Sequence, residues 1–237
     1  MSEETRTGFH DSLAAVTDQL VQMAAYVTEG VGRTTEALLA LDIAAADQII
    51  TSDDELDLLS LEVEEATIQM LALESPVAAD LRRLVTDLKL NSEIERSGDL
   101  VTNIAKAIGR LQGIELEPVL RGLLTQMCEQ CVRLFGHAMD AYVEQDLGVA
   151  RMLPELDDRL DELHDEYIQT IFDSRGRHVI NTQQALQLAV IGRFYERIGD
   201  HAVNIAERVT YLVTGEMPEH AGAMRARARR EAAEAQG

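Results

Sequence analysis

The stretch ERSGDLVTNIAK, residues 95–106, decides the fold, because the chain repeats it as ERIGDHAVNIAE at residues 196–207. Seven of the twelve positions are identical, and the offset between the copies is 196 − 95 = 101 residues in a chain of 237. A gapless match of this kind indicates a tandem duplication. We therefore expect two similar halves.

Each copy carries a ladder of polar residues at helical spacing. Glutamate, aspartate and asparagine follow one another at i, i+4 and i+8, and on a helix these positions project from roughly one face. The glycine shared by both copies costs about 1 kcal/mol relative to alanine in a helix. Its recurrence therefore predicts the close approach of another helix. The residues concerned are Glu95, Gly98, Asp99 and Asn103 in the first copy, and Glu196, Gly199, Asp200 and Asn204 in the second.

The apolar residues predict an all-α fold, since they recur at intervals of three and four and no segment alternates with period two. The expected helices cover residues 9–41, 43–73, 76–112, 118–145, 147–172 and 182–213. Ser75 offers the third helix a cap with Pro76 in its first position, and Pro154 predicts a kink or restart in the fifth helix. The prediction is two tandem three-helix bundles related by internal duplication.

Domain boundaries follow from the same duplication. We expect a first three-helix repeat over residues 8–113 and a second over residues 117–215. Residues 219–237 hold few large apolar groups and include the basic run RARARR, residues 225–230. They predict a flexible basic tail.

The acidic composition restricts which kinds of molecule the protein is expected to bind. The net charge of −21 and the pI near 4.5 argue against nucleic acid and leave cations and basic proteins as partners. No apolar run approaches the roughly 18–20 residues of a membrane span, and the N-terminus lacks the pattern of a secretion signal. We expect a cytoplasmic protein without direct membrane insertion.

The two cysteines lie three residues apart in a helical pattern. Cys128 and Cys131 are expected to be small apolar residues on a bundle helix.

A second acidic element is also repeated. The pattern D-D-x-L-D occurs at residues 53–57 and again at residues 157–161, an offset of 157 − 53 = 104. If each pair of helices faces one site, four carboxylates converge in each half. Carboxylates at i and i+4 repel one another, so an arginine, a cation from another helix or a metal ion should compensate. Hard oxygen ligands suit magnesium, calcium, manganese or iron. The alternative is that the element simply complements a helix dipole.

Enzyme chemistry receives little support from the sequence. None of the six histidines forms a repeated pair, and no glycine-rich phosphate loop, G-x-S-x-G motif or Cys-His nucleophile arrangement occurs. The protein is therefore expected not to be an enzyme. A metal-dependent hydrolase or redox bundle and a metal-free structural adaptor remain as alternatives.

Three motifs resemble the PhoU family. The duplicated Glu-Arg-x-Gly-Asp-x-x-x-Asn-Ile-Ala element is similar to the family's signature, PVAADLR at residues 76–82 is similar to its P-V-A-x-D-L-R element, and YLVTGE at residues 211–216 is also similar. The resemblance covers nearly all of residues 8–217. At the offset of 101, PVAADLR falls on RHVINTQ, residues 177–183, so this element is present only once.

The resemblance implies two three-helix bundles and a role in phosphate control. Such proteins act beside the phosphate-specific ABC transporter, bridging its ATPase subunit and a membrane sensor histidine kinase, and keep phosphate-starvation genes off when phosphate is plentiful. We expect the same partners, a homodimer, and a location in the cytoplasm or, through partners, at the inner face of the membrane.

The resemblance also implies metal binding through E/D-x-x-x-D motifs, with iron or zinc as the ions, while magnesium or manganese would suit the oxygen ligands. The implied ligands are Glu95, Asp99, Glu196 and Asp200, with Asp53, Asp57, Asp157 and Asp161 as second-rank ligands. The expected supporting residues are Asn103, Asn204, Arg96 and Arg197.

Overall fold

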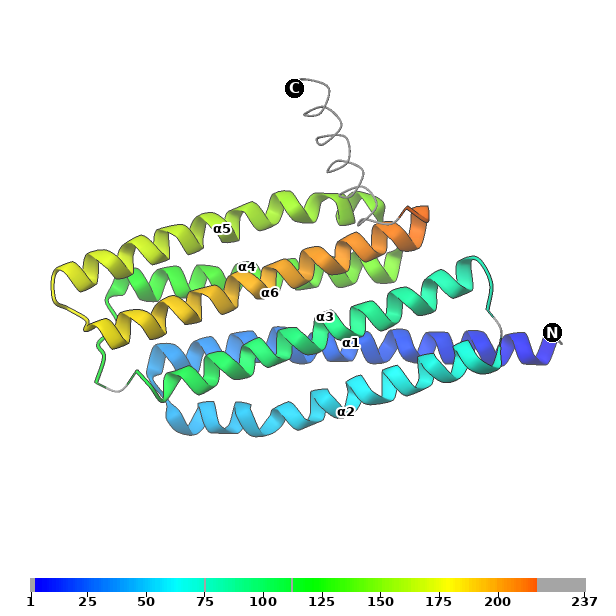
Figure 1. Ribbon diagram of the computed structural model, residues 1–237, viewed down its shortest axis with the longest axis horizontal. Helices are drawn as coiled ribbons and strands as arrows, with labels where there is room; N and C mark the ends of the chain where they lie inside the picture. Colours follow the sequence, from blue (N-terminus) through cyan, green and yellow to red (C-terminus); the bar gives the residue numbers. More distant parts are fainter. Residues whose placement is uncertain (1–2, 75, 112, 217–237) are drawn as a thin grey trace, which may run out of the picture.

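The computed structural model describes residues 3–74, 76–111 and 113–216, and nearly all of them lie in six helices (Figure 1). The helices are α1 (Glu3–Ala40), α2 (Ile43–Leu73), α3 (Ala79–Ile108), α4 (Pro118–Glu144), α5 (Leu147–Gly176) and α6 (Thr182–Thr214). Among the described residues there is no strand. The predicted all-α fold is confirmed.

Short polar caps explain where several helices begin and end. The side chain of Asp42 accepts from Ala45 N at the start of α2, and Asp146 plays the same part for α5. Asn181 and Gln184 form a reciprocal capping box at the start of α6. That helix ends at Gly215, whose φ of 78° lies in the left-handed region that glycine adopts at low cost.

Four predicted boundaries are wrong. The first helix begins at Glu3 rather than at residue 9, and the third ends at Ile108 rather than near residue 112. The third helix begins at Ala79 rather than Pro76, because the backbone of Ala78 takes a positive φ of 50° that a helix does not allow; the expected cap Ser75 lies outside the described residues. The fifth helix continues to Gly176 rather than ending at residue 172, since Ser174 is buried and anchored by a hydrogen bond to Glu117. It passes through the exposed Pro154 without a restart.

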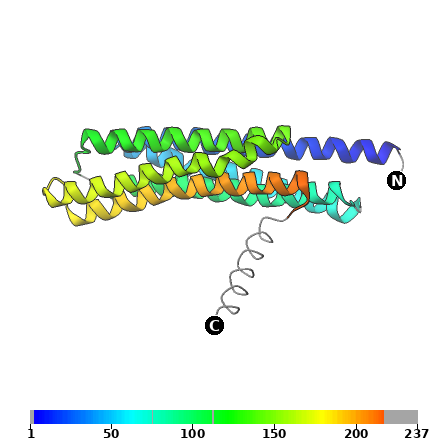
Figure 2. The same cartoon turned by 90° about the horizontal axis from the view of Figure 1, so that it is seen from above.

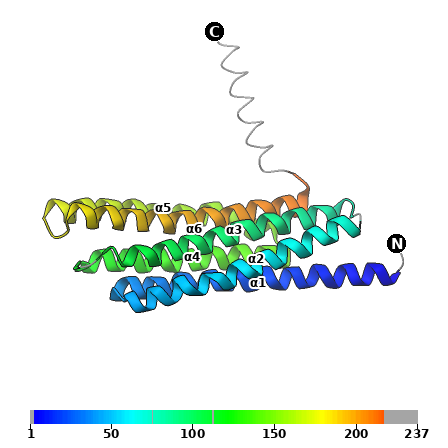
Figure 3. The same ribbon diagram turned by 60° about the horizontal axis from the view of Figure 1, so that its bottom comes forward.

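The two three-helix bundles lie side by side with α3 and α6 at their common boundary. Helix α3 packs on α1, α2 and α6, while α6 packs on α3, α4 and α5, and α1 also contacts α4. Figures 2 and 3 show all six helices running roughly along one long axis. The two helices that carry the repeated ladder are therefore central, and each lies against the helix that carries its D-D-x-L-D element.

The core is mainly aliphatic, as the low aromatic content predicts. Val16, Leu20, Met23, Val27 and Val31 along α1 are all at most 1% exposed. The largest side chains below 2% exposure are the tyrosines Tyr142, Tyr167 and Tyr195. Among residues 3–74, 76–111 and 113–216, no helix combines the length and apolar character needed to cross a membrane.

Candidate metal sites and the family of the chain

The two repeated elements meet in both halves. A Cβ added to Gly98 would collide with Leu56 of the first D-D-x-L-D element and lie 3.9 Å from Asp53 Oδ1. A Cβ added to Gly199 would lie 2.5 Å from both Asp157 Oδ1 and Leu160 Cδ2 of the second. The close helix approach predicted from the recurring glycine is confirmed. The glycine brings each ladder next to its D-D-x-L-D element.

The first acidic cluster consists of Asp53, Asp57, Glu95 and Asp99. Burial raises the pKa of Asp53 and of Glu95, and the charges of the neighbouring carboxylates in the cluster raise both further. Asp57 and Asp99 are exposed, whereas Asp53 and Glu95 are half-buried. The four candidate ligands therefore feel one another's charge across the α2–α3 boundary.

The second acidic cluster consists of Asp157, Asp161, Glu196 and Asp200. Burial raises the pKa of Asp157 to about 7, and the negative charges of Asp161 and Asp200 add to the effect. The pKa of Asp161 is raised too, by burial and then by Asp200. Asp157 Oδ1 is shielded from solvent and has no hydrogen-bond partner among the described residues. This carboxylate is the least compensated group of the site.

The two clusters differ in what opposes their negative charge. The hydroxyl of Thr102 and the ammonium of Lys106 both lower the pKa of Asp53. At the offset of 101, the corresponding residues in the second half are Val203 and Glu207, which supply neither a hydrogen bond nor a positive charge. Asp157 therefore lacks the compensation that Asp53 receives.

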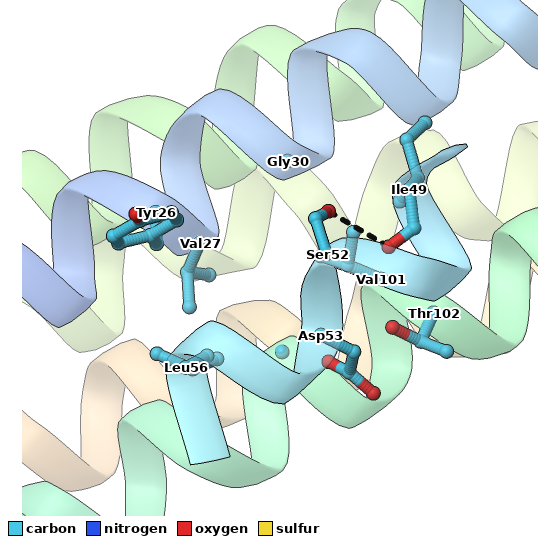
Figure 4. Close-up of a pocket in the computed structure, with 10 residues that line it drawn as sticks. Tyr26, Val27, Gly30, Ile49, Ser52, Asp53, Leu56, Val101 and Thr102 are labelled. Atoms are coloured by element: carbon cyan, nitrogen blue, oxygen red, sulfur yellow. Dashed lines mark hydrogen bonds between the residues drawn. The ribbon is translucent and has the colours of Figure 1, made fainter. Parts of the chain in front are cut away.

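A small hollow adjoins the first cluster (Figure 4). Its volume is about 40 Å³, and residues of α1, α2 and α3 line it, including Gly30, Asp53, Gly98 and Thr102. A volume of this size has room for one water molecule or one ion. Of the four acidic residues of the first cluster, only Asp53 lines it.

The supporting residues are placed differently from one another. Arg96 and Arg197 are exposed, Asn103 is half-buried, and the amide of Asn204 donates to Glu93 Oε2 of α3 at 3.0 Å. Glu196 forms an ion pair with Arg193, one turn earlier on α6, so the compensating arginine, one of the expected alternatives, is Arg193 rather than the adjacent Arg197. As the side chains stand, no three described His, Cys, Asp or Glu residues are placed so as to hold a metal ion together.

Polar contacts at the boundary between the halves were also not anticipated. Glu93 lies 2.6 Å from His201 Nδ1, and Asp87 accepts from Tyr142 Oη at 2.6 Å. Neither pair repeats, since at the offset of 101 the counterparts of His201 and Asp87 are Leu100 and Leu188. A search for repeated motifs therefore passes over them, and only their burial in the folded chain reveals them.

Comparison with known proteins places the chain among relatives of matching length. It is 33% identical over 215 residues to the phosphate-specific transport system accessory protein PhoU homolog 1 of Mycobacterium leprae, covering 90% of this chain and 96% of that protein. It is 32% identical over 214 residues to PhoU homolog 2 of Mycobacterium tuberculosis, covering 90% of this chain and 100% of the relative.

Solved structures agree in fold. The crystal structure of PhoU from Pseudomonas aeruginosa superposes with a TM-score of 0.81 at 27% identity, covering 88% of this chain and 100% of that one. The phosphate transport system regulatory protein PhoU from Streptococcus pneumoniae gives 0.81 at 25% identity, covering 88% and 98%. The sequence model of the PhoU domain matches twice, at residues 20–108 and 124–209. The chain, with one such domain in each half, belongs to the PhoU family.

Proposed function

We propose that the protein is a non-enzymatic accessory regulator of phosphate transport that holds metal ions in its two acidic clusters. Its family and the names of its relatives support the regulatory role. We further propose that it docks on the ATPase subunit of the phosphate ABC transporter and on a sensor histidine kinase, and keeps the phosphate-starvation response off when phosphate is plentiful.

The state of the thiols supports a non-enzymatic reading. Burial raises the pKa of Cys128 and raises that of the fully buried Cys131 well above its usual range. A thiol of this kind stays protonated at neutral pH and is a poor nucleophile. The two cysteines are therefore packing residues of α4, where Cys131 donates a weak hydrogen bond to Tyr195 O at 3.3 Å.

The metal proposal rests chiefly on Asp157. A shielded carboxylate oxygen without a hydrogen-bond partner, among further carboxylates, is unfavourable unless a proton or a cation compensates it. In the proposal, Asp157, Asp161, Glu196 and Asp200 hold the ion of the second half. The exposed members Asp161 and Asp200 are free to turn toward it, which convergence requires.

The first cluster would bind in the same way through Asp53, Asp57, Glu95 and Asp99, although Thr102 and Lys106 already relieve part of its charge. Iron or zinc are the ions proposed from the family, and the all-oxygen donor set also suits magnesium or manganese. When bound, the ions supply positive charge. They thereby neutralise two repulsive patches and complete a surface that another protein can approach.

An apolar stripe on α2 supports self-association. Leu58, Leu61 and Ile68 are 62%, 51% and 50% exposed, and their spacing places them on one side of the helix. At the offset of 104, Leu58 and Leu61 correspond to Glu162 and Asp165 on α5. Only Ile68 has an apolar counterpart, the exposed Phe172, so the complete stripe occurs only in the first half. We propose that it is the homodimer contact. Leu61→Glu should then halve the mass measured by light scattering, and an unchanged mass would remove the stripe from the interface.

The function is tested by purification without chelator, elemental analysis and a pull-down of the transporter ATPase. The wild-type protein should retain metal and capture the ATPase, whereas Asp99→Ala with Asp200→Ala should lose both. Asp140→Asn removes an exposed aspartate outside the clusters and should change neither.

The outcomes separate the competing functions. A double variant that folds and keeps its metal would refute the ligand assignment. A metal-free wild-type protein that still captures the ATPase and melts unchanged after chelation would instead make the chain a metal-free adaptor. Turnover of a phosphate ester by metal-loaded protein would overturn the non-enzymatic reading.

A further inference from the structure

A cavity of about 410 Å³ opens at the end of the molecule where α1, α3 and α6 meet. Figure 1 shows the start of α3, the end of α6 and α1 gathered there, at the right of the view. The lining includes His10 and Thr17 of α1, Arg82 and Arg83 of α3, and Leu212 of α6. Small-molecule pockets commonly measure about 300–1,000 Å³, so the space admits a ligand larger than a single ion.

The charge of the lining reverses that of the chain. The whole sequence has 42 acidic and 21 basic residues. Among the charged residues that line the cavity, two are arginines, Arg82 and Arg83, and one is acidic, Asp80. Such a local excess of positive charge in an acidic protein favours an anion over the cations that the acidic clusters attract.

Arg83 is held in a fixed orientation. Its Nη2 donates to Thr17 Oγ1 at 2.7 Å, its Nε lies 3.0 Å from Asp87 Oδ1, and its guanidinium stacks over the ring of Tyr142 at 4.4 Å. Because these contacts come from α1, α3 and α4, the guanidinium is ordered before any ligand arrives. Asp87 offsets part of its charge, so Arg83 shapes the wall and Arg82 supplies the main attraction.

The side chain of Arg82 has an N–H donor, at Nε, that makes no hydrogen bond within the described residues. The same Nε is shielded from solvent. An unsatisfied shielded N–H is unfavourable, and a small rotation of the Arg82 side chain toward an acceptor oxygen in the cavity would relieve it. A guanidinium can grip a carboxylate or phosphate through two parallel hydrogen bonds.

The first turn of α3 brings the positive end of the helix dipole to the cavity, where the Asp80 carboxylate offsets part of it. Ala79 and Asp80 line the cavity, and the cap residue Ala78 gives the helix no side-chain hydrogen bond. The first turn of a helix carries a partial positive charge that attracts anions. Leu13 and Leu212 add apolar surface to the lining of the same cavity.

From these features together we propose that the cavity binds a small organic oxyanion. Its phosphate or carboxylate group would lie against Arg82 and the start of α3, and its apolar part against Leu13 and Leu212. The site is formed by residues outside both acidic clusters, so this inference stands apart from the metal proposal. The element that builds it, PVAADLR, is absent from the second half, so one such site is expected per chain.

A purely structural role for Arg82 makes a different prediction. The guanidinium lies beside Gly215 at the end of α6: a Cβ added to Gly215 would lie 3.6 Å from Arg82 Nη1. A cation at this position also balances the negative end of the helix dipole. In that case Arg82→Gln would lower the melting temperature, but wild-type protein would bind no anion.

The test follows the arginine Nε–H resonances by NMR while phenyl phosphate, benzoate or inorganic phosphate is added to the full chain. We expect the Arg82 resonance to move with phenyl phosphate or benzoate, whichever oxyanion the site prefers, and to saturate at lower concentration than with inorganic phosphate. Arg82→Gln should weaken binding at least tenfold. Arg151→Gln, which removes an exposed arginine of α5, should leave it unchanged.

Three results would overturn the inference. The Arg82 resonance could stay fixed with all three probes, Arg82→Gln could bind as the wild type does, or inorganic phosphate could bind as tightly as the organic anions. Circular dichroism of both variants checks that they are folded. A loss of binding counts as evidence only for a variant whose spectrum matches that of the wild type.

Discussion

Gly199 lies directly against Asp157: a Cβ at the glycine would come within 2.5 Å of the carboxylate oxygen Oδ1. The two repeated motifs of the second half, the ladder and the D-D-x-L-D element, are in contact here because residue 199 has no side chain. Because glycine has no Cβ, α5 and α6 approach closely enough for Asp157 to be half-buried beside Asp200. Gly98 plays the same part between α2 and α3.

Gly199→Ala should destabilise the protein although alanine favours helices. The methyl group must displace both Asp157 and Leu160, and overpacking of this kind costs about 1–3 kcal/mol against a propensity gain of about 1 kcal/mol. Urea unfolding measures the difference. Gly122→Ala on α4 is the control, since nothing lies within 4 Å of its Cβ, and it should stabilise. Equal effects of the two substitutions would show that the contact is unimportant.

Asp157→Asn should stabilise the metal-free protein and weaken metal binding. Its pKa is raised to about 7 by burial and by Asp161 and Asp200, so the ionised form is disfavoured in the folded state at pH 8. Removing the charge should add about 1–2 kcal/mol to the free energy of unfolding, less than the shift alone implies because the group is partly exposed. Destabilisation of the metal-free variant at pH 8 would contradict this account.

Asp87, at the boundary between the halves, should make the free energy of unfolding depend on pH. Burial raises its pKa to about 6, against the opposing effect of Arg83, so the folded state holds the proton that the unfolded chain loses near pH 3.8. The contribution of Asp87 to stability therefore falls as pH rises from about 4 to 6, by up to about 3 kcal/mol. Other carboxylates with raised pKa values also contribute to the slope. Unfolding across this range should therefore show a steeper fall in the wild type than in Asp87→Asn, and equal slopes would contradict the assignment.

Glu93 should respond to pH in the opposite sense. Burial alone would raise its pKa, but hydrogen bonds from His201 and Asn204 outweigh burial and lower it below the ordinary value of 4.5. Its contribution is therefore present above pH 4.5 and is lost as pH falls through the lowered pKa. Glu93→Gln should cost about 1–3 kcal/mol at pH 7, and the cost should shrink in acid. A cost that does not change with pH would show that the charge of Glu93 is not involved.

Much of the fold could be predicted from the sequence because helical periodicity and duplication are local signals. The second and fourth helices begin where expected, at Ile43 and Pro118, and the last begins at Thr182. The start of α3 could not be predicted, since the positive φ of Ala78 is imposed by the tertiary path between α2 and α3. The end of α5 depends on Glu117, which lies 57 residues away from Ser174 in the chain.

The candidate site was partly predictable for the same reason. Repetition identified the carboxylates and the glycine that lets them meet, because both halves need the same arrangement. It could not identify the ion pair of Arg193 with Glu196, nor the different neighbours Thr102 and Val203 that set the two clusters apart. It also missed Glu93, His201 and Asp87, because contacts between the halves have no reason to repeat.

Anomalous X-ray diffraction from crystals of protein purified with its metal would test the central claim most directly. The account predicts one peak between α5 and α6 and a weaker one between α2 and α3. Asp157, Asp161, Glu196 and Asp200 should surround the first peak, and Asp53, Asp57, Glu95 and Asp99 the second. Data collected on both sides of the absorption edge identify the element. Carboxylates that contact only water and arginine, with neither an anomalous peak nor the density of a coordinated ion beside either cluster in metal-replete protein, would contradict it.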